Sequence, residues 1–296
     1  MSTPPTRSGF VALAGRPNVG KSTLANALIG AKVAIVSDKP QTTRRAIRGV
    51  ATGPDWQLVL VDLPGVQRPR DELTTRMQRR VESELKDADG CLFVLAATDG
   101  VGRGDHFIAK LLSAASTPVV IAANKTDAAD RAQIAATLQA AEELEVAEHI
   151  FAVSATTGVG VGELQRALIE LLPPGPLYFE PRQHTDQPQP ALLSELVREQ
   201  VLRRTREEVP HAVEVEVREI DHREDLVRIE AVILAETESQ KGILIGAGGR
   251  MVKAIGTAAR KEIEGELGVH VDLELSIRVR RHWRADERLL DRLGIE

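Results

Sequence analysis

Two patterns of apolar and polar residues divide the chain. In the first, short uninterrupted apolar runs alternate with longer stretches in which apolar residues recur every three to four positions. Such runs are typical of strands buried on both faces, and the longer stretches are typical of helices that cover a sheet. Residues 9–172 are therefore predicted to form an α/β domain with a mainly parallel, doubly wound sheet. The strands are predicted at Phe10–Ala14, Ala46–Ala51, Gln57–Val61, Gly90–Ala96, Pro118–Ala123 and His149–Val153.

The second pattern begins at residue 191 and predicts an α+β domain over residues 191–296. Runs that alternate between apolar and polar residues, typical of half-exposed strands, stand between helical stretches. The predicted order is helix, strand, strand, helix, helix, strand. In that order the elements cover residues 191–208, 212–217, 226–235 and 239–245, a helix from Arg250, and residues 269–279.

A proline-dense stretch separates the two patterns at residues 173–190. Several prolines close together favour an extended, semi-rigid connector, so the domain boundary is predicted there. The first eight residues, Met1–Ser8, are polar and include two prolines, and we expect them to be disordered.

The first predicted strand runs directly into Gly15-Arg16-Pro17-Asn18-Val19-Gly20-Lys21-Ser22, with an amphipathic stretch after it. This is the phosphate-binding loop pattern in its required context of strand, loop and helix. Glycines let successive N–H groups close on a polyphosphate, and the helix N-terminus adds partial positive charge. We expect Lys21 to reach the β and γ phosphates, Ser22 to bind Mg²⁺ and Thr23 to line the site. An ordinary glycine turn before a helix is the alternative interpretation.

The third predicted strand ends in Asp62-Leu63-Pro64-Gly65. An aspartate at this position can hold Mg²⁺ through water, and the N–H of Gly65 can bind a γ-phosphate. On its own, an aspartate before a Pro-Gly turn is commonplace. In a chain that also has a phosphate loop, we assign all four residues to the nucleotide site, with Asp62 as a metal ligand and Gly65 as a catalytic residue alongside Lys21.

The fifth predicted strand is followed by Asn124-Lys125-Thr126-Asp127. The carboxylate of Asp127 can accept hydrogen bonds from N1–H and the 2-amino group of guanine, whereas adenine would leave that charge unpaired. Lys125 can lie along the base, and Ser154-Ala155-Thr156 can supply backbone donors to the guanine carbonyl. For Asp127 considered alone, a helix cap is the simpler interpretation. With Asn124 and Lys125 just before it, guanine binding is the favoured interpretation. We predict GTP and GDP as ligands and Mg²⁺ as cofactor.

Composition narrows the class of protein. A net charge of -5 and a pI near 5.9 argue against a protein that coats nucleic acid, although not against a local basic face. The single cysteine, Cys91, lies in an apolar run and is predicted to be a buried core thiol. No secretion signal or membrane-spanning run is evident, so we expect a cytoplasmic protein.

The second domain contains the loop Gly246-Ala247-Gly248-Gly249 between its two adjacent helices. Glycines here would let a nucleic-acid backbone press against two helix ends. Basic residues of the following helix share one face and apolar residues another, while acids outnumber basic residues over the whole domain, so a simple solvated face remains the alternative. Trp283 is predicted to be a packing residue. The predicted RNA-binding residues are Lys241, Gly246, Ala247, Gly248, Gly249, Arg250 and Lys253.

The order of motifs in the first domain resembles the translation-factor branch of small GTPases. In that comparison Pro40-Gln41-Thr42-Thr43-Arg44 is similar to switch I, whose threonine binds Mg²⁺ when γ-phosphate is present. Thr43 matches the ligand position best, and we count it as a catalytic residue, with Thr42 second. Val66 replaces the glutamine that orients water in Ras-like enzymes. Similar GTPases use the asparagine at the position of Asn18 to hold K⁺, which suggests potassium-stimulated hydrolysis.

The element order of the second domain resembles a type II KH domain, and the two domains together resemble the Era family of GTPases. The resemblance spans nearly the whole chain and is most specific over residues 238–256. It implies a GTP-hydrolysing switch that binds the 3′ end of small-subunit (16S) rRNA and assists assembly of the 30S ribosomal subunit. A monomer with at most weak peripheral association with the inner membrane face is expected. Leu63 and Ala247 depart from the threonine and lysine usual in the family.

Two alternatives remain at this point. One is a signalling switch that acts on a protein or membrane partner, with a KH-like platform that binds no RNA. It predicts that effectors contact only the switch loops, at residues 32–44 and 63–79. The other is a metabolic kinase with a phosphate loop, which the guanine-selective motif disfavours.

Overall fold

The computed structural model describes residues 6–39, 41–66, 69, 71–115 and 117–295. The chain forms two compact units. The first comprises residues up to Val36, Thr43–Arg70 and Thr74–Asp186, and the second comprises Ser37–Thr42, Asp71–Leu73 and Gln187–Glu296. Two short segments of the N-terminal half are thus part of the second unit. No helix in the described part of the chain is both long and apolar enough to cross a bilayer.

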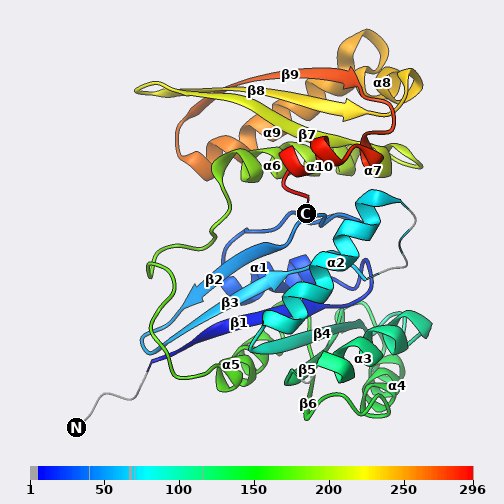
Figure 1. Ribbon diagram of the computed structural model, residues 1–296, viewed down its shortest axis with the longest axis vertical. Coiled ribbons are helices and arrows are strands. Elements are labelled where there is room, and N and C mark those ends of the chain that lie inside the picture. Colours follow the sequence, from blue (N-terminus) through cyan, green and yellow to red (C-terminus); the bar gives the residue numbers. More distant parts are fainter. Residues whose placement is uncertain (1–5, 40, 67–68, 70, 116, 296) are drawn as a thin grey trace. The chain divides into compact units, whose positions relative to one another are not determined.

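The first unit is built on one six-stranded sheet in the order β2-β3-β1-β4-β5-β6 (Figure 1). All neighbouring strands are parallel except β2 and β3, which are antiparallel. The strands are β1 (Arg7–Ala14), β2 (Ile47–Thr52), β3 (Trp56–Asp62), β4 (Gly90–Ala96), β5 (Val119–Asn124) and β6 (His149–Ala152).

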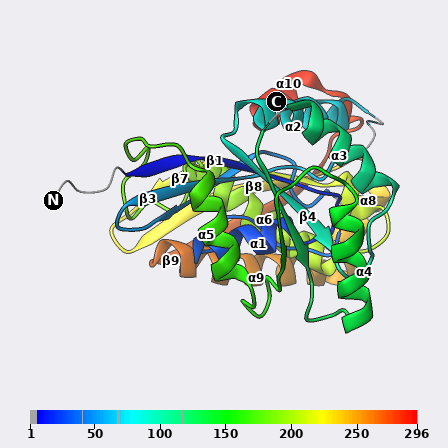
Figure 2. The same ribbon diagram turned by 90° about the horizontal axis from the view of Figure 1, so that it is seen from below.

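Helices cover both faces of this sheet, as the uninterrupted apolar strands require. One core joins the sheet to α1 (Lys21–Ile29) and α5 (Val161–Leu171) (Figure 2). A second core joins the opposite face to α2 (Glu72–Asp87), α3 (Arg103–Ala115) and α4 (Arg131–Glu142). The predicted mainly parallel, doubly wound α/β fold is confirmed.

Two local features differ from the sequence prediction. The strand β1 begins at Arg7, whose N–H donates to the carbonyl of Asp55 at 3.0 Å, so the expectation of disorder through Ser8 is wrong for Arg7 and Ser8. Residues 1–5 lie outside the described residues. The proline-dense stretch is bonded to the edge of the sheet: the N–H of Val50 donates to the carbonyl of His184 at 2.8 Å. Both segments gain backbone partners that composition does not reveal.

The main part of the second unit is a three-stranded sheet in the order β7-β8-β9, with α6 and α9 packed into one core against it. The strands β7 and β8 are antiparallel, and β8 and β9 are parallel. Its elements are α6 (Gln189–Arg204), α7 (Val209–Ala212), β7 (Glu214–His222), β8 (Leu226–Ala235), α8 (Glu238–Ile245), the short helix η1 (Ala247–Gly249), α9 (Arg250–Leu267), β9 (His270–Val279), η2 (Trp283–Ala285) and α10 (Glu287–Arg292). The elements α6, β7, β8, α8, α9 and β9 have the predicted α+β order of a type II KH domain, whereas α7, η1, η2 and α10 were not predicted.

Candidate functional site

The phosphate loop occupies the turn between β1 and α1, at the carboxyl edge of the sheet. Two of its glycines are enclosed by neighbouring atoms. A Cβ on Gly15 would lie 2.6 Å from the carbonyl oxygen of Val94, and one on Gly20 would lie 2.4 Å from Nδ2 of Asn124. Gly20 also has a φ of 95°, which other residues rarely adopt. The loop therefore needs glycine at both positions for steric reasons.

Lys21, at the start of α1, folds back over this loop. Its ammonium group donates to the carbonyl oxygens of Gly15 and Arg16, both at 3.0 Å, and the side chain is 6% exposed. Burial lowers the pKa of Lys21 to about 8, although the nearby carboxylate of Asp62 acts in the opposite direction. The cation is thus held at the floor of the loop.

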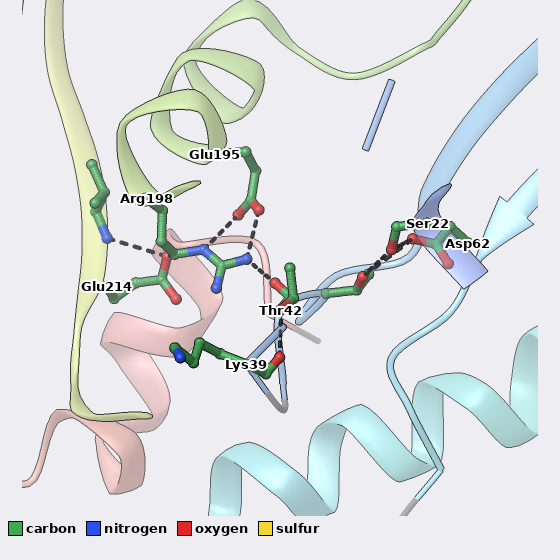
Figure 3. A network of polar contacts seen from close by, with 9 residues as sticks. Ser22, Lys39, Thr42, Asp62, Glu195, Arg198 and Glu214 are labelled. Atoms are coloured by element: carbon green, nitrogen blue, oxygen red, sulfur yellow. Dashed lines mark hydrogen bonds and ion pairs between the residues drawn. The ribbon is translucent and has the colours of Figure 1, made fainter. Parts of the chain in front are cut away.

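Three side chains with oxygen atoms that could bind a metal ion meet beside Lys21. The hydroxyl of Ser22 donates to Oδ2 of Asp62 at 2.7 Å, and the hydroxyl of Thr43 lies 3.0 Å from Ser22 and 3.1 Å from the same carboxylate oxygen (Figure 3). Thr42 does not join them, because its hydroxyl donates to the carbonyl of Lys39 at 2.6 Å. The geometry therefore brings Thr43, rather than Thr42, to the predicted metal ligands.

Asp62 is 1% exposed, and its Oδ1 has no hydrogen-bond partner among the residues that the structure describes. Burial raises the pKa of this carboxyl, against the lowering influence of Lys21, Ser22 and Thr43. Hard oxygen donors of this kind, with one carboxylate oxygen still unbonded, suit Mg²⁺. The residues therefore fit the predicted ion.

The segment after Asp62 lies directly against the phosphate loop. A Cβ on Gly65 would lie 2.8 Å from the backbone nitrogen of Pro17, and the N–H of Val66 donates to the carbonyl of Gly15 at 3.2 Å. Leu63 and Pro64 are buried. The side chain of Val66 is 5% exposed and packs in the apolar core, so it offers no polar group to orient water.

The predicted base-binding residues also meet at this edge of the sheet. Asn124 is 2% exposed and bridges two loops: its amide donates to the carbonyl of Val19 at 3.1 Å and accepts from the N–H of Ala155 at 3.0 Å. Lys125 donates to the carbonyl of Asn18 at 2.5 Å. The exposed carboxylate of Asp127 is fixed by the hydroxyl of Ser154 at 2.6 Å.

The loop residues Pro17, Asn18 and Thr23 and the third member of the last motif, Thr156, are part of these same segments. Sequence reasoning missed one residue that supports the site. Asp105 is fully buried in the first turn of α3 and forms an ion pair with Arg16 at 2.8 Å, while Arg16 also donates to the carbonyl of Gly100 at 3.2 Å. Nothing in the local sequence around Asp105 indicates this partner.

A second candidate site lies at the glycine loop of the second unit. Helix α8 begins with a capping box between Thr237 and Gln240 and ends at Gly246. Gly246, Gly248 and Gly249 have φ values of 69°, 60° and 79°, so the loop turns through conformations that favour glycine. Ala247 and Gly248 are exposed.

The predicted basic residues are placed around this loop and the next helix. Arg250 and Lys253 are exposed and Lys241 is half-buried, while Ile255, Ala259 and Ile263 of α9 are fully buried. Lys253 and Arg260 flank a groove of about 290 Å³ between α9 and β9, whose other lining residues are Val252, Gly256, Thr257, Leu273 and Leu275. The groove is thus lined by both apolar side chains and two cations.

Two smaller predictions are confirmed. Trp283 is fully buried, with its indole N–H donating to the carbonyl of Ala212 at 2.8 Å, and so is a packing residue. Cys91 is fully buried in β4, and burial raises the pKa of its thiol to about 12.

Comparison with known proteins identifies the family. Residues 10–125 match a family described as 50S ribosome-binding GTPase, and residues 208–284 match the KH domain. GTPase Era of Lactobacillus helveticus is 44% identical over 291 residues, which cover 98% of this chain and 96% of the relative. GTPase Era of Geobacter metallireducens is 44% identical, with 99% of each chain covered. The chain belongs to the Era family of GTPases.

Solved structures of Era agree with this assignment. An Era variant from Aquifex aeolicus bound to GDP and AlF₄⁻ is similar with a TM-score of 0.94 and 33% identity, covering 98% of this chain and 99% of that one. An Era complex with MgGDPNP and nucleotides 1506–1542 of 16S ribosomal RNA is similar with the same TM-score, 34% identity and the same coverage. The nucleotide motifs and the glycine loop described above are therefore those of an Era-family GTPase.

Proposed function

We propose that this Era-family GTPase works as a Mg²⁺-dependent switch in the cytoplasm that binds the 3′ region of 16S rRNA through its KH domain and assists assembly of the 30S subunit. The observation that carries the proposal is the presence, in one chain, of the Ser22–Thr43–Asp62 oxygen cluster and the Gly246–Gly249 loop, in which Ala247 and Gly248 are exposed. The first would sense the nucleotide, and the second would hold the RNA.

In the nucleotide site, the loop amides between Gly15 and Ser22 would donate to the phosphates, with α1 adding its N-terminal partial charge. Lys21 already lies at the floor of the loop and would exchange two carbonyl partners for phosphate oxygens. Ser22, Thr43 and Asp62 would hold Mg²⁺, which neutralises charge that develops on the phosphates. The N–H of Gly65 would donate to the γ-phosphate.

Guanine selection would depend on Asp127 because Ser154 fixes its carboxylate in one orientation. Asn124 supports this geometry by tying the phosphate loop to the loop that contains Ala155. A preorganised carboxylate rejects a base without two donors, since the bound base would exclude water from the charge and leave it without partners.

Residue 66 is valine, so it provides no side-chain amide to orient the attacking water during hydrolysis. We infer that K⁺ supplies part of the missing stabilisation, held by Asn18 at the exposed side of the phosphate loop. Turnover should then be faster in K⁺ than in Na⁺ at equal ionic strength, and Asn18→Ala should remove the difference. Equal turnover of the unmodified protein in the two salts would contradict this inference.

The RNA site would combine backbone donors with nearby cations. A single strand could press against Gly246–Gly249, with Arg250, Lys253 and Lys241 close to its phosphates and its bases over the groove beside α9. The solved Era complex with nucleotides 1506–1542 of 16S rRNA supports this choice of ligand. Ala247 removes one cation that is usual in the family, so more of the affinity should depend on Arg250 and Lys253.

Filter binding tests the proposal. A labelled strand that matches the 3′ end of 16S rRNA is titrated with the GDPNP-bound protein, with a scrambled strand as control. Gly248→Asp should abolish binding because it adds a negative charge where phosphate would lie, while Gly248→Ala serves as the matched control. RNA affinity that is equal in Gly248→Asp and in the unmodified protein would favour a switch that acts on a protein partner instead.

A further inference from the structure

Helix α6 of the second unit carries buried charged side chains. Glu195, Arg198 and Glu199 are 4%, 0% and 0% exposed, and Glu214 at the start of β7 is 0% exposed. A buried charge destabilises a fold unless it is paired and hydrogen-bonded, and an apolar residue of similar size often serves stability better. A fully buried arginine therefore suggests a purpose beyond packing.

The guanidinium group of Arg198 is held in one orientation. Its Nε and Nη2 donate to the two carboxylate oxygens of Glu195 at 3.2 and 2.6 Å, and Nε lies 3.8 Å from a carboxylate oxygen of Glu214. A two-pronged pair of this kind fixes the plane of the guanidinium. In that plane, Nη2 also donates to the carbonyl oxygen of Thr42 (Figure 3).

Arg198 and Thr42 both belong to the second unit, in which Ser37–Thr42 forms a separate segment. That segment also has hydrogen bonds of its own. The hydroxyl of Thr42 donates to the carbonyl oxygen of Lys39, and the backbone N–H of Lys39 donates to the hydroxyl of Ser37 at 3.1 Å. The carbonyl oxygen of Thr42, which accepts a hydrogen bond from Arg198, therefore belongs to a segment that is also held by hydrogen bonds of its own.

The peptide group that begins at this carbonyl leads directly to Thr43, whose hydroxyl lies in the Ser22–Thr43–Asp62 cluster. Consecutive Cα atoms are about 3.8 Å apart, and the peptide plane between them is rigid. Fixing the carbonyl of Thr42 therefore restricts where the side chain of Thr43 can point.

We propose that Arg198 is a positioning residue for the nucleotide switch: it orients the Thr42–Thr43 peptide so that Thr43 can reach Mg²⁺ when a γ-phosphate is bound. Glu195 and Glu214 act through Arg198 by fixing its guanidinium group. Coupling is reciprocal in free energy, so a nucleotide that draws Thr43 inward also favours the arrangement of α6 that presents Arg198. The inference rests on the proposed Mg²⁺–GTP site.

The test compares affinities for Mg²⁺–GDPNP and Mg²⁺–GDP, measured with fluorescent nucleotide analogues. Arg198→Lys keeps the positive charge but cannot contact Glu195 and Thr42 with one planar fork. We expect its GDPNP affinity to fall about tenfold, the effect of one charge-assisted hydrogen bond, while its GDP affinity stays within about twofold. GDP lacks the γ-phosphate that brings Thr43 to the metal, which makes it the internal control.

Arg203→Gln is the matched control variant, because Arg203 lies on the same helix and pairs with Glu199 at 2.9 Å. It should leave the GDPNP-to-GDP affinity ratio unchanged. The double variant Arg198→Met with Glu195→Gln removes the charge pair together and provides a second folded form if Arg198→Lys is unstable. It should show the same loss of nucleotide discrimination.

Hydrogen exchange of the unmodified protein needs no variant. Replacing GDP by GDPNP should slow exchange both in residues 37–45 and in α6. The proposal is overturned by an unchanged affinity ratio in a folded Arg198 variant, or by slower exchange in residues 37–45 without any change in α6. Failure of the proposed function has another signature, since the unmodified protein would then bind neither nucleotide.

Discussion

The two glycine loops of this protein each precede a helix, α1 in the first unit and α9 in the second, yet they differ in how closely neighbouring atoms enclose them. In the phosphate loop, a Cβ on Gly15 or Gly20 would collide with atoms 2.4 to 2.6 Å away. In the KH loop, a Cβ on Gly246 would lie 2.7 Å from Cβ of Met251, but one on Gly248 or Gly249 would meet nothing within 4 Å, although both have positive φ. The phosphate loop is enclosed at both of these glycines, whereas the KH loop is enclosed at its first glycine and open at Gly248 and Gly249.

This difference explains how each loop can recognise phosphate. The enclosed loop has its polar groups fixed in advance by Asn124, Lys21 and the ion pair of Arg16 with Asp105. Preorganisation of this kind favours tight and selective binding of one small ligand. The open part of the KH loop leaves room for a polymer to pass, and we expect its affinity for RNA to depend on nearby cations and to fall with salt.

The largest effect should come from placing the same side chain in both loops. Gly20→Ala should reduce GDP affinity by on the order of 100-fold or more, because Asn124 is held by Val19 and Ala155 and cannot move aside. Gly248→Ala should leave RNA affinity within about threefold, since only its backbone strain changes.

Nucleotide and RNA titrations of both variants provide the measurement, with melting temperatures to verify folding. A Gly20→Ala protein that binds GDP normally would refute the description of the phosphate loop as enclosed.

The next effect concerns the fixed carboxylate of the base site. Asp127→Ala should lower GTP affinity by about 10- to 100-fold, because two hydrogen bonds to a charged group are lost. Discrimination between GTP and ATP should fall in the same variant, since the mutant site no longer disfavours a base without donors. Competition of GTP and ATP against a fluorescent GDP analogue measures both changes. If the ratio of ATP affinity to GTP affinity were the same as in the unmodified protein, the role of Asp127 in guanine selection would be contradicted.

A smaller effect should appear on raising the pH. Lys21 has a pKa of about 8 in the free protein, below the 10.5 of an exposed lysine, so between these values the unfolded chain binds more protons and stability rises with pH. Phosphate favours the charged form, so nucleotide binding takes up a proton and affinity falls above pH 8. From pH 7 to 8.5 we expect a loss of about fourfold.

Lys21→Arg is the control for this effect, because arginine stays charged throughout and its affinity should be flat with pH. A fourfold loss in that variant too would assign the pH dependence to another group.

The smallest effect should come from restoring a cation to the open loop. Ala247→Lys should raise RNA affinity by about threefold and steepen the salt dependence by about one unit, because an exposed residue gains one phosphate contact. RNA titrations at several salt concentrations measure this. A drop in affinity would mean that the loop is less open than its geometry indicates.

Much of the fold could be predicted because local signals agree with tertiary structure. Uninterrupted apolar runs such as Gly90–Ala96 can be buried only as central strands, and glycines at Gly15 and Gly246 mark turns that other residues cannot make. The sequence favoured Thr43 over Thr42 as the metal ligand only through the resemblance to switch I, since adjacent threonines differ only in which way the backbone points them.

Other parts have no local signal. Glu195, Arg198 and Glu199 have the spacing of exposed helical ion pairs, and only long-range packing makes them buried. The pairing of Arg16 with Asp105 joins the phosphate loop to the first turn of α3, far apart in the sequence, so no short window of sequence contains it. The strand β7 continues past a register shift at Val217–Glu219 through the mostly polar residues 219–222, because β8 pairs with each of those four residues.

As a nucleotide switch that binds RNA, this protein should couple the bound guanine nucleotide to its affinity for RNA. The affinity of the unmodified protein for the 3′-end 16S strand can be measured with GDPNP, with GDP and without nucleotide, at one salt concentration. We expect tight binding with GDPNP and at least about tenfold weaker binding with GDP, the size of a typical allosteric coupling. Equal RNA affinity in all three states, in a protein that binds both nucleotides, would contradict this expectation.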